Sequence, residues 1–236
     1  GRGLTATGAT LGVTLDGETL TLRDLDATLA GGRIAGRATS TRQGGSAALS
    51  GEGQITDAAI PDLVGPGPVD GRVTAQLRFG SSGESLTGLM NNLGGSGTLT
   101  LAGLSLPGAD PAGLDRALTR ALAEDDPLRD GRLQALAAEE LGAGPLIVKG
   151  SVSSPVSLVG GTLRAGPLTL PLGSARWNGT LGIDLRDGRI DARGSLLAGQ
   201  APKGWSGANP SIQLGFSGPI RNPERSIDAG PVANGL

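Results

Sequence analysis

The chain has 236 residues, among them 43 Gly and 15 Pro, and 20 Lys and Arg against 22 Asp and Glu leave a formal net charge of −2. It contains no Cys, His or Tyr, which excludes disulfides, Ser-His-Asp and Cys-His catalytic units, and zinc sites built from nitrogen and sulfur ligands. With two Trp, two Phe and no basic excess, it offers no stacking surface for nucleic acid and no basic patch for a membrane surface. We therefore expect no nucleic-acid partner and no metal.

The glycines separate alternating apolar runs, so they indicate turns in a folded β protein rather than disorder. No run of about 18 apolar residues occurs, so we expect no bilayer-spanning segment here. Any membrane anchor would lie outside this chain.

Alternating apolar residues predict strands in the first quarter of the chain. Residues 11–15 and 20–22 alternate Leu or Val with polar residues around Asp16-Gly17, which predicts a β-hairpin. The alternation changes phase at Arg23-Asp24, which predicts a β-bulge. Further strands are expected at 33–40 and 47–54, and a single helical turn at 60–64.

The centre of the chain predicts a strand, a helix and a returning strand. Residues 73–79 alternate, and Leu86, Leu89, Met90 and Leu93 follow at helical spacing. Gly94-Gly95 ends this helix, because glycine adopts the left-handed conformation at little cost. The returning strand is expected over 98–104.

Two helices are predicted to interrupt the strands that follow. Asp110-Pro111 begins the first, whose Leu114, Leu118 and Leu122 form an apolar stripe, and the second covers about 131–141. They are more simply explained as a cover for a sheet face than as a lid. The strands expected afterwards span 145–153, 156–163, 168–172, 180–185, 189–196 and 212–216.

These elements predict a mainly β fold. We expect an antiparallel meander curled into a groove or an open sandwich, with a short helix and a two-helix insert. The domain organisation is a β domain over 1–218, with its insert at about 110–142, and a loose C-terminal tail over 219–236.

The central motifs resemble the C-terminal region of the AsmA family. The resemblance rests on Gly71-Arg72-Val73, on Gly83-Glu84-Ser85-Leu86, on Leu93-Gly94-Gly95-Ser96-Gly97-Thr98-Leu99-Thr100-Leu101 and on Ala109-Asp110, and it covers most of residues 1–220. These motifs are loose, being built from Gly and Leu.

The resemblance implies a periplasm-facing protein anchored in the inner membrane of Gram-negative bacteria. The implied protein is similar to bridge-like proteins whose repeating β-groove carries phospholipid toward the outer membrane and supports the assembly of that membrane. The family has no catalytic motif or cofactor, so a non-enzymatic role is expected, with phospholipid and other envelope proteins as partners. Family members have an N-terminal membrane helix, so the membrane connection is expected outside this chain.

Acyl chains need apolar area and no hydrogen-bond partners, so alternating aliphatic residues are candidate groove walls. The same residues would equally fill a closed, dry core in a structural or protein-binding scaffold, because alternation does not say what covers a face. A glycan-acting enzyme is disfavoured, because no carboxylate pair stands beside stacking aromatics. The candidate lipid-binding residues are Val73, Leu77, Phe79, Leu99, Leu101, Leu181, Ile183, Leu185, Ile190, Ile212, Leu214 and Phe216.

Two smaller features each have a functional interpretation and a simpler structural one. Glu124, Asp125 and Asp126 would suit a cation, but a solvated helix end explains them more simply. Trp177 and Trp205 would suit a membrane interface or a groove rim, but packing anchors are the simpler reading.

Overall fold

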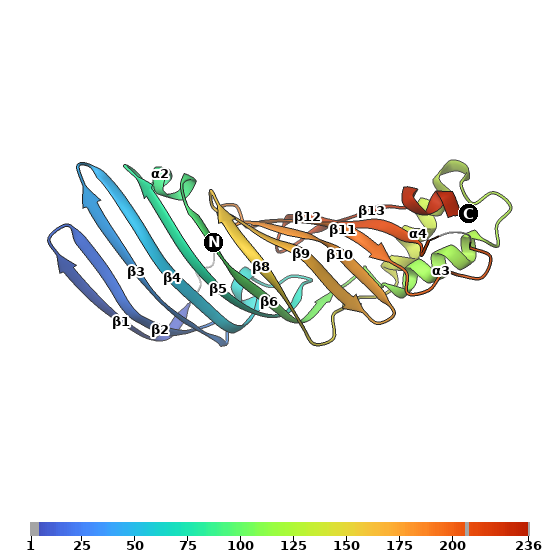
Figure 1. Cartoon of the computed structure of the whole chain (residues 1–236). Helices are drawn as coiled ribbons and strands as arrows, with labels where there is room; N and C mark the ends of the chain where they lie inside the picture. The colour runs from blue at the N-terminus through green and yellow to red at the C-terminus, as the bar shows by residue number, and fades with distance from the viewer. Residues whose placement is uncertain (1–4, 206–207, 236) are drawn as a thin grey trace.

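The computed structural model describes residues 5–205 and 208–235, and a 13-stranded antiparallel sheet runs through this part of the chain. Each long strand pairs with the strands before and after it in sequence, while β7 pairs only with the end of β6. β1 and β13 are the two edges, so the sheet is open (Figure 1). The predicted mainly β meander is confirmed.

The element bounds are as follows. The first strands are β1 (Ala6–Asp16), β2 (Thr19–Leu29), β3 (Gly32–Gln43), β4 (Ser46–Ala59) and β5 (Asp70–Gly83). The later strands are β6 (Gly94–Leu106), β7 (Leu146–Ile147), β8 (Ser151–Val159), β9 (Thr162–Leu172), β10 (Ala175–Asp184), β11 (Arg189–Leu197), β12 (Ser211–Pro219) and β13 (Glu224–Asp228). The helices are α1 (Ile60–Val64), α2 (Leu86–Asn91), α3 (Ala112–Ala121) and α4 (Arg132–Gly142), with 3₁₀ turns η1 (Arg129–Gly131) and η2 (Gly230–Gly235).

The predicted bulge lies where the alternation changes phase. The register of β2 against β3 shifts between Leu22 and Leu25, and Asp24 has a φ of 54°. The extra residue returns the apolar side chains to one side of the sheet. Leu20, Leu22, Leu25 and Ala27 therefore share a face.

The strand boundaries after the helical insert differ from the prediction. β8 runs through Ser154-Pro155, where a break was expected, and the turn falls at Gly160-Gly161, inside the predicted strand 156–163. Both glycines have positive φ, 56° and 79°, which the turn requires and a side chain would oppose. β10 also ends at Asp184, so Leu185 lies in a turn instead of extending the strand.

The prediction of a loose tail over 219–236 is wrong for its described part. Residues 224–228 form β13 against β12, and η2 follows with Val232 buried. Gln134 of α4 fixes this segment: its Nε2 donates to Ile227 O at 2.6 Å, and its Oε1 accepts from Ala229 N at 2.9 Å. A helix distant in sequence thus orders the tail.

One side of the sheet is apolar across nearly all strands, and we call it the inner face. Antiparallel partners project from the same side, so the register carries this face from strand to strand. One row of paired positions consists of Leu25, Gly36, Gly53, Leu77, Gly97, Val156, Ala165, Leu181, Ala192 and Phe216. The opposite side is called the outer face.

The second half of the sheet curls until distant segments meet. β6, β8, β9, β10 and β11 lie between β5 and β12, so a flat sheet would hold these two ~29 Å apart at ~4.8 Å per strand. Yet Arg221, just after β12, donates from Nε to Val64 O at the end of α1. A Cβ on Gly67 would lie only 2.6 Å from Arg221 O. This contact closes the curl at one point.

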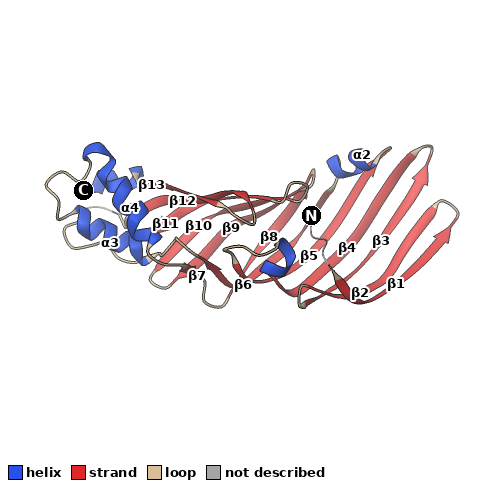
Figure 2. Ribbon diagram, turned by 180° about the vertical axis from the view of Figure 1, so that it is seen from behind, coloured by secondary structure: helices blue, strands red, loops and turns tan. Residues whose placement is uncertain are grey.

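Helices α3 and α4 lie at the end of the molecule away from β1 and β2 (Figures 1 and 2). Their buried Leu114, Leu118, Leu136 and Leu141 belong to the same hydrophobic core as Ile212 of β12. The helices therefore cover part of the inner face, as predicted.

Candidate functional site: the inner face of the sheet

The structure brings eleven of the twelve candidate residues onto the inner face. The register pairs Val73 with Leu101, Ile183 with Ile190, and Leu196 with Ile212, in each case on the apolar side. The exception is Leu185, which is exposed in the turn after β10. Whether these residues contact lipid stays a prediction.

Four of the eleven lie inside the core and present almost no surface. Ile212 and Leu214 are fully buried, and Leu99 and Phe216 are nearly so. They pack among β12, β6 and the two helices. In this conformation they stabilise the fold and have no surface free for a ligand.

The other seven remain partly accessible. Val73, Leu77 and Phe79 of β5, Leu101 of β6, Leu181 and Ile183 of β10, and Ile190 of β11 are half-buried. All but Phe79 and Ile183 also pack against the hydrophobic core, and each of the seven keeps part of its surface exposed to solvent. These seven residues form the uncovered apolar surface.

Sequence reasoning left four further aliphatic residues off the candidate list. Leu11, Val13 and Leu15 of β1 and Leu20 of β2 are exposed. Val13 pairs with Leu22 and Leu15 with Leu20, so they continue the inner face to the edge of the sheet. The signal was present, because these residues show the same alternation as β5.

Trp177 is buried in the helix-covered part of the inner face. Its indole lies against Gly179 and Gly194, where an added Cβ would approach ring atoms to 2.5 Å and 2.7 Å. Its Nε1 donates to Leu214 O at 2.9 Å, which satisfies the polar edge of a buried ring. The packing interpretation of Trp177 is therefore correct.

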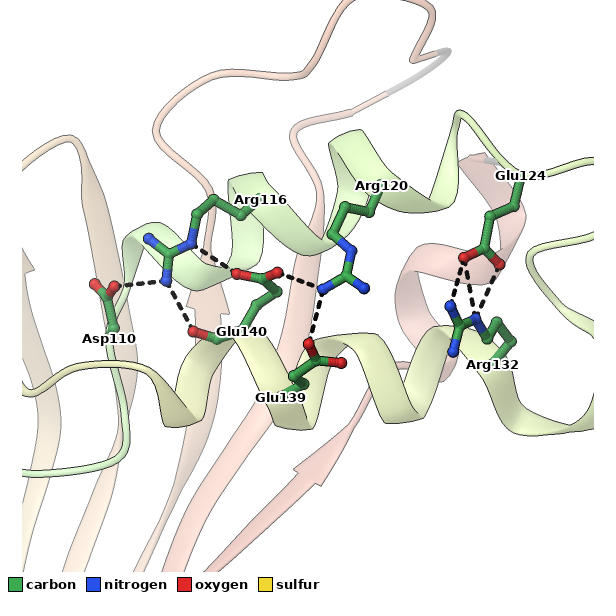
Figure 3. Close-up of polar contacts among 7 residues, drawn as sticks. All are labelled: Asp110, Arg116, Arg120, Glu124, Arg132, Glu139 and Glu140. Atoms are coloured by element: carbon green, nitrogen blue, oxygen red, sulfur yellow. Dashed lines mark hydrogen bonds and ion pairs between the residues drawn. The ribbon is translucent and has the colours of Figure 1, made fainter.

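Arginines and carboxylates join α3 to α4 on the outside of the pair (Figure 3). Arg116 Nε donates to Glu140 Oε2 at 2.8 Å, and Arg120 Nη1 donates to Glu140 Oε1 at 2.6 Å. Hydrogen bonds from Arg116, which has the larger effect, and from Arg120 lower the pKa of the Glu140 carboxyl group. Arg116 Nη2 also reaches Asp110 Oδ2 at 2.8 Å. This network holds the two helices together as one cover.

Of the three acidic residues after α3, Glu124 contributes to the same contact, whereas Asp125 and Asp126 are exposed. Glu124 accepts from Arg132 Nη2 at 2.9 Å, and this hydrogen bond lowers the pKa of Glu124. The described residues contain no group of three or more acidic side chains that would hold a metal ion.

The ion pairs of the sheet lie on the outer face. Glu52 contacts Arg37 at 3.0 Å and Arg78 at 3.6 Å, and Asp191 contacts Arg193 at 2.7 Å. A shallow hollow of about 610 Å³ also lies there, between side chains that include Gln54, Gln76, Glu52 and Arg78. Charge and polarity are thus concentrated on the side opposite the candidate residues.

Within the described residues, no helix combines the length and apolar character needed to cross a bilayer. No family model matches the chain, and no curated protein or solved structure does either. The resemblance to the AsmA family therefore stays a prediction.

Proposed function

We propose that this chain binds phospholipid acyl chains along the uncovered apolar surface of its inner face. It acts without catalysis, as the groove-bearing part of a protein on the periplasmic side of the inner membrane that supports lipid transport to the outer membrane. The location and the direction of transport come from the resemblance to the AsmA family. The acyl-chain specificity comes from the chemistry of the surface.

The observation that carries the proposal is that the inner face is only half covered. Leu77, Ile183 and Ile190 project from the same side as fully buried Leu214, yet they remain half-buried. An aliphatic surface of this kind gains about 0.8 kcal/mol for each CH₂ group that it removes from water. An acyl chain supplies many such groups and needs no hydrogen-bond partner.

The test is native mass spectrometry of the chain expressed in bacteria and purified in mild detergent, followed by lipid extraction. We expect co-purified phospholipid in the wild type and its loss in Ile183→Asp, whose circular dichroism should stay β-like. Thr180→Asp is the matched control, because Thr180 lies exposed on the outer face of the same strand. This control should retain lipid.

A second candidate function is a dry scaffold in envelope assembly, which the core around Ile212 and Leu196 favours because both are fully buried. A lipid-free mass in repeated wild-type preparations would support the scaffold and contradict lipid binding. Unfolding of Ile183→Asp would point the same way, because an unpaired charge in a closed core costs several kcal/mol.

A further inference from the structure

Three connections between strands, all at the same ends of the strands, carry exposed aliphatic side chains. Leu86 and Met90 on α2 are 83 % and 39 % exposed, Val159 at the end of β8 is 67 % exposed, and Leu185 after β10 is 52 % exposed. All lie at the strand ends opposite the α3–α4 insert. We call these four residues the apolar rim.

Backbone hydrogen bonds join the three connections. Gly160 N donates to Leu93 O at 2.8 Å, which attaches the β8–β9 turn to the end of α2. Leu185 N donates to Gly161 O at 3.0 Å, which attaches the β10–β11 turn to the same glycine pair. Asn92 Nδ2 also donates to Ser82 O at 2.8 Å and fixes α2 against β5. The three connections are therefore neighbours at the same ends of the strands. Figure 1 shows α2 at these strand ends, away from α3 and α4.

The rim borders the uncovered apolar surface of the inner face. Phe79 lies near the rim end of β5, and Ile183 and Ile190 face each other at the rim end of β10 and β11. All three are half-buried. Leu86, Met90 and Leu185 therefore lie at the same strand ends as this surface, whereas Val159 alternates with buried Leu158 and projects from the outer face.

The charge distribution indicates what the rim contacts. No charged residue occurs from 85 to 109 or from 150 to 163, which includes α2 and the β8–β9 turn. The third turn itself contains Arg186 and Asp187, with Asp184 before it and Arg189 after it, so its formal charges cancel. Arg186 Nη2 pairs with Asp184 Oδ2 at 2.8 Å. The two uncharged connections, α2 and the β8–β9 turn, can enter the headgroup layer without the cost of desolvating an ion. A neutral rim also has no electrostatic preference for anionic lipid.

We propose that the apolar rim docks on the surface of a lipid bilayer and is the place where acyl chains pass between the bilayer and the inner face. This inference rests on the proposed lipid-binding function, because it assigns an entry point to that surface. Docking is driven by burial of aliphatic side chains rather than by charge. It is therefore insensitive to salt and to anionic lipid.

The experiment is flotation of the whole chain with vesicles of pure phosphatidylcholine. The rim variant is Leu86→Asp with Met90→Asp, and the matched control is Leu128→Asp with Ile147→Asp. The control residues are similarly aliphatic and exposed, 48 % and 49 %, but lie near the opposite strand ends. We expect the wild type and the control to float, and the rim variant to bind about tenfold less, since acidic side chains are strongly disfavoured in the bilayer.

Two conditions check the driving force. Flotation should persist in about 0.5 M salt, where surface charges are screened, and should not require phosphatidylglycerol in the vesicles. Loss in salt, a requirement for anionic lipid, or equal loss in the rim and control variants would overturn the proposal. A wild type that does not float would overturn it as well and would leave the rim as a contact for another protein.

A fluorescent fatty acid in vesicle-free buffer separates this inference from the proposed function. The rim variant should bind this probe as the wild type does, since the inner face is unchanged. If the wild type binds vesicles but not the probe, the lipid-binding function fails while bilayer docking stands. If the rim variant loses the probe and keeps a β-like circular dichroism spectrum, the assigned entry role is wrong, because the rim residues are then part of the binding surface itself.

Discussion

The first five strands of the sheet and its helix-covered second half carry the same alternating pattern, but their apolar side chains differ in burial. Ile212 and Leu214 on β12 are fully buried, whereas Val13 and Leu15 on β1 are 58 % and 72 % exposed. Both pairs lie on the inner face. Alternation therefore predicts which side of a strand is apolar, while burial depends on what is packed over it.

The cover of the second half comes from segments that are distant in sequence. α3 and α4 supply their apolar stripes, and Arg221 fastens the curled sheet to the end of α1. In the first half, Ala58 beside α1 and Ala27 are buried, and most inner side chains have no such cover. This contrast predicts that the two halves respond differently to equivalent substitutions.

The largest difference is expected for leucine truncation. Leu214→Ala should lower the free energy of unfolding by about 2–5 kcal/mol, because it leaves a cavity in a close-packed core. Leu77→Ala should lower it by about 1 kcal/mol, because Leu77 is only half-buried and water can reach the site. Urea unfolding of the two variants measures both values. Equal losses would mean that the first half is covered as tightly as the second.

Glycine substitution gives a second matched comparison on the inner face. A Cβ at Gly194 would lie 2.3 Å from Asn178 O and 2.7 Å from the Trp177 ring, whereas a Cβ at Gly53 meets nothing within 4 Å. Gly194→Ala should destabilise the chain by about 1–3 kcal/mol. Gly53→Ala should be neutral or stabilise it by up to about 1 kcal/mol, because alanine restricts the unfolded chain.

Thermal unfolding of the two alanine variants, with tryptophan fluorescence as the probe, checks this pair. A normal emission spectrum for Gly194→Ala would show that Trp177 keeps its place over the glycine. A stable Gly194→Ala protein would contradict the tight packing of that ring.

The smallest effect concerns the ion pairs that join the covering helices. Arg116 and Arg120 hold the pKa of Glu140 below its ordinary value of 4.5. A lowered folded-state pKa contributes stability above the ordinary value, and this stability is lost as the pH falls below it toward the folded-state value. The wild type should therefore lose more stability than Glu140→Gln between pH values of about 6 and 3.

Asp115 on α3 contributes with the opposite sign, because burial raises the pKa of its carboxyl group. Its contribution is present at low pH and is lost as the pH rises. Glu140→Gln leaves Asp115 in place, so the difference between the two pH profiles isolates the network. Parallel profiles would show that the network adds no pH-dependent stability.

Much of the fold follows from local patterns in the sequence. The alternation of 73–79, the phase change at Arg23-Asp24 and the apolar stripe of Leu114 and Leu118 each predict an element that the structure contains. The boundaries of β8 were mistaken, because Ser154-Pro155 has the composition of a break, whereas Gly160-Gly161 forms the turn. The tail was mistaken because its partner, Gln134, lies about 90 residues earlier in the chain.

The sequence by itself determined the mainly β class, the position of the helical insert and the apolar side of each strand, since these depend on residues within a few positions of one another. Only the tertiary structure decided that Leu214 is fully buried while Leu77 is half-buried. The reason is that burial depends on helices and turns brought over the sheet from elsewhere in the chain. Local periodicity predicts which side of a strand is apolar, and three-dimensional packing determines which of those side chains are buried.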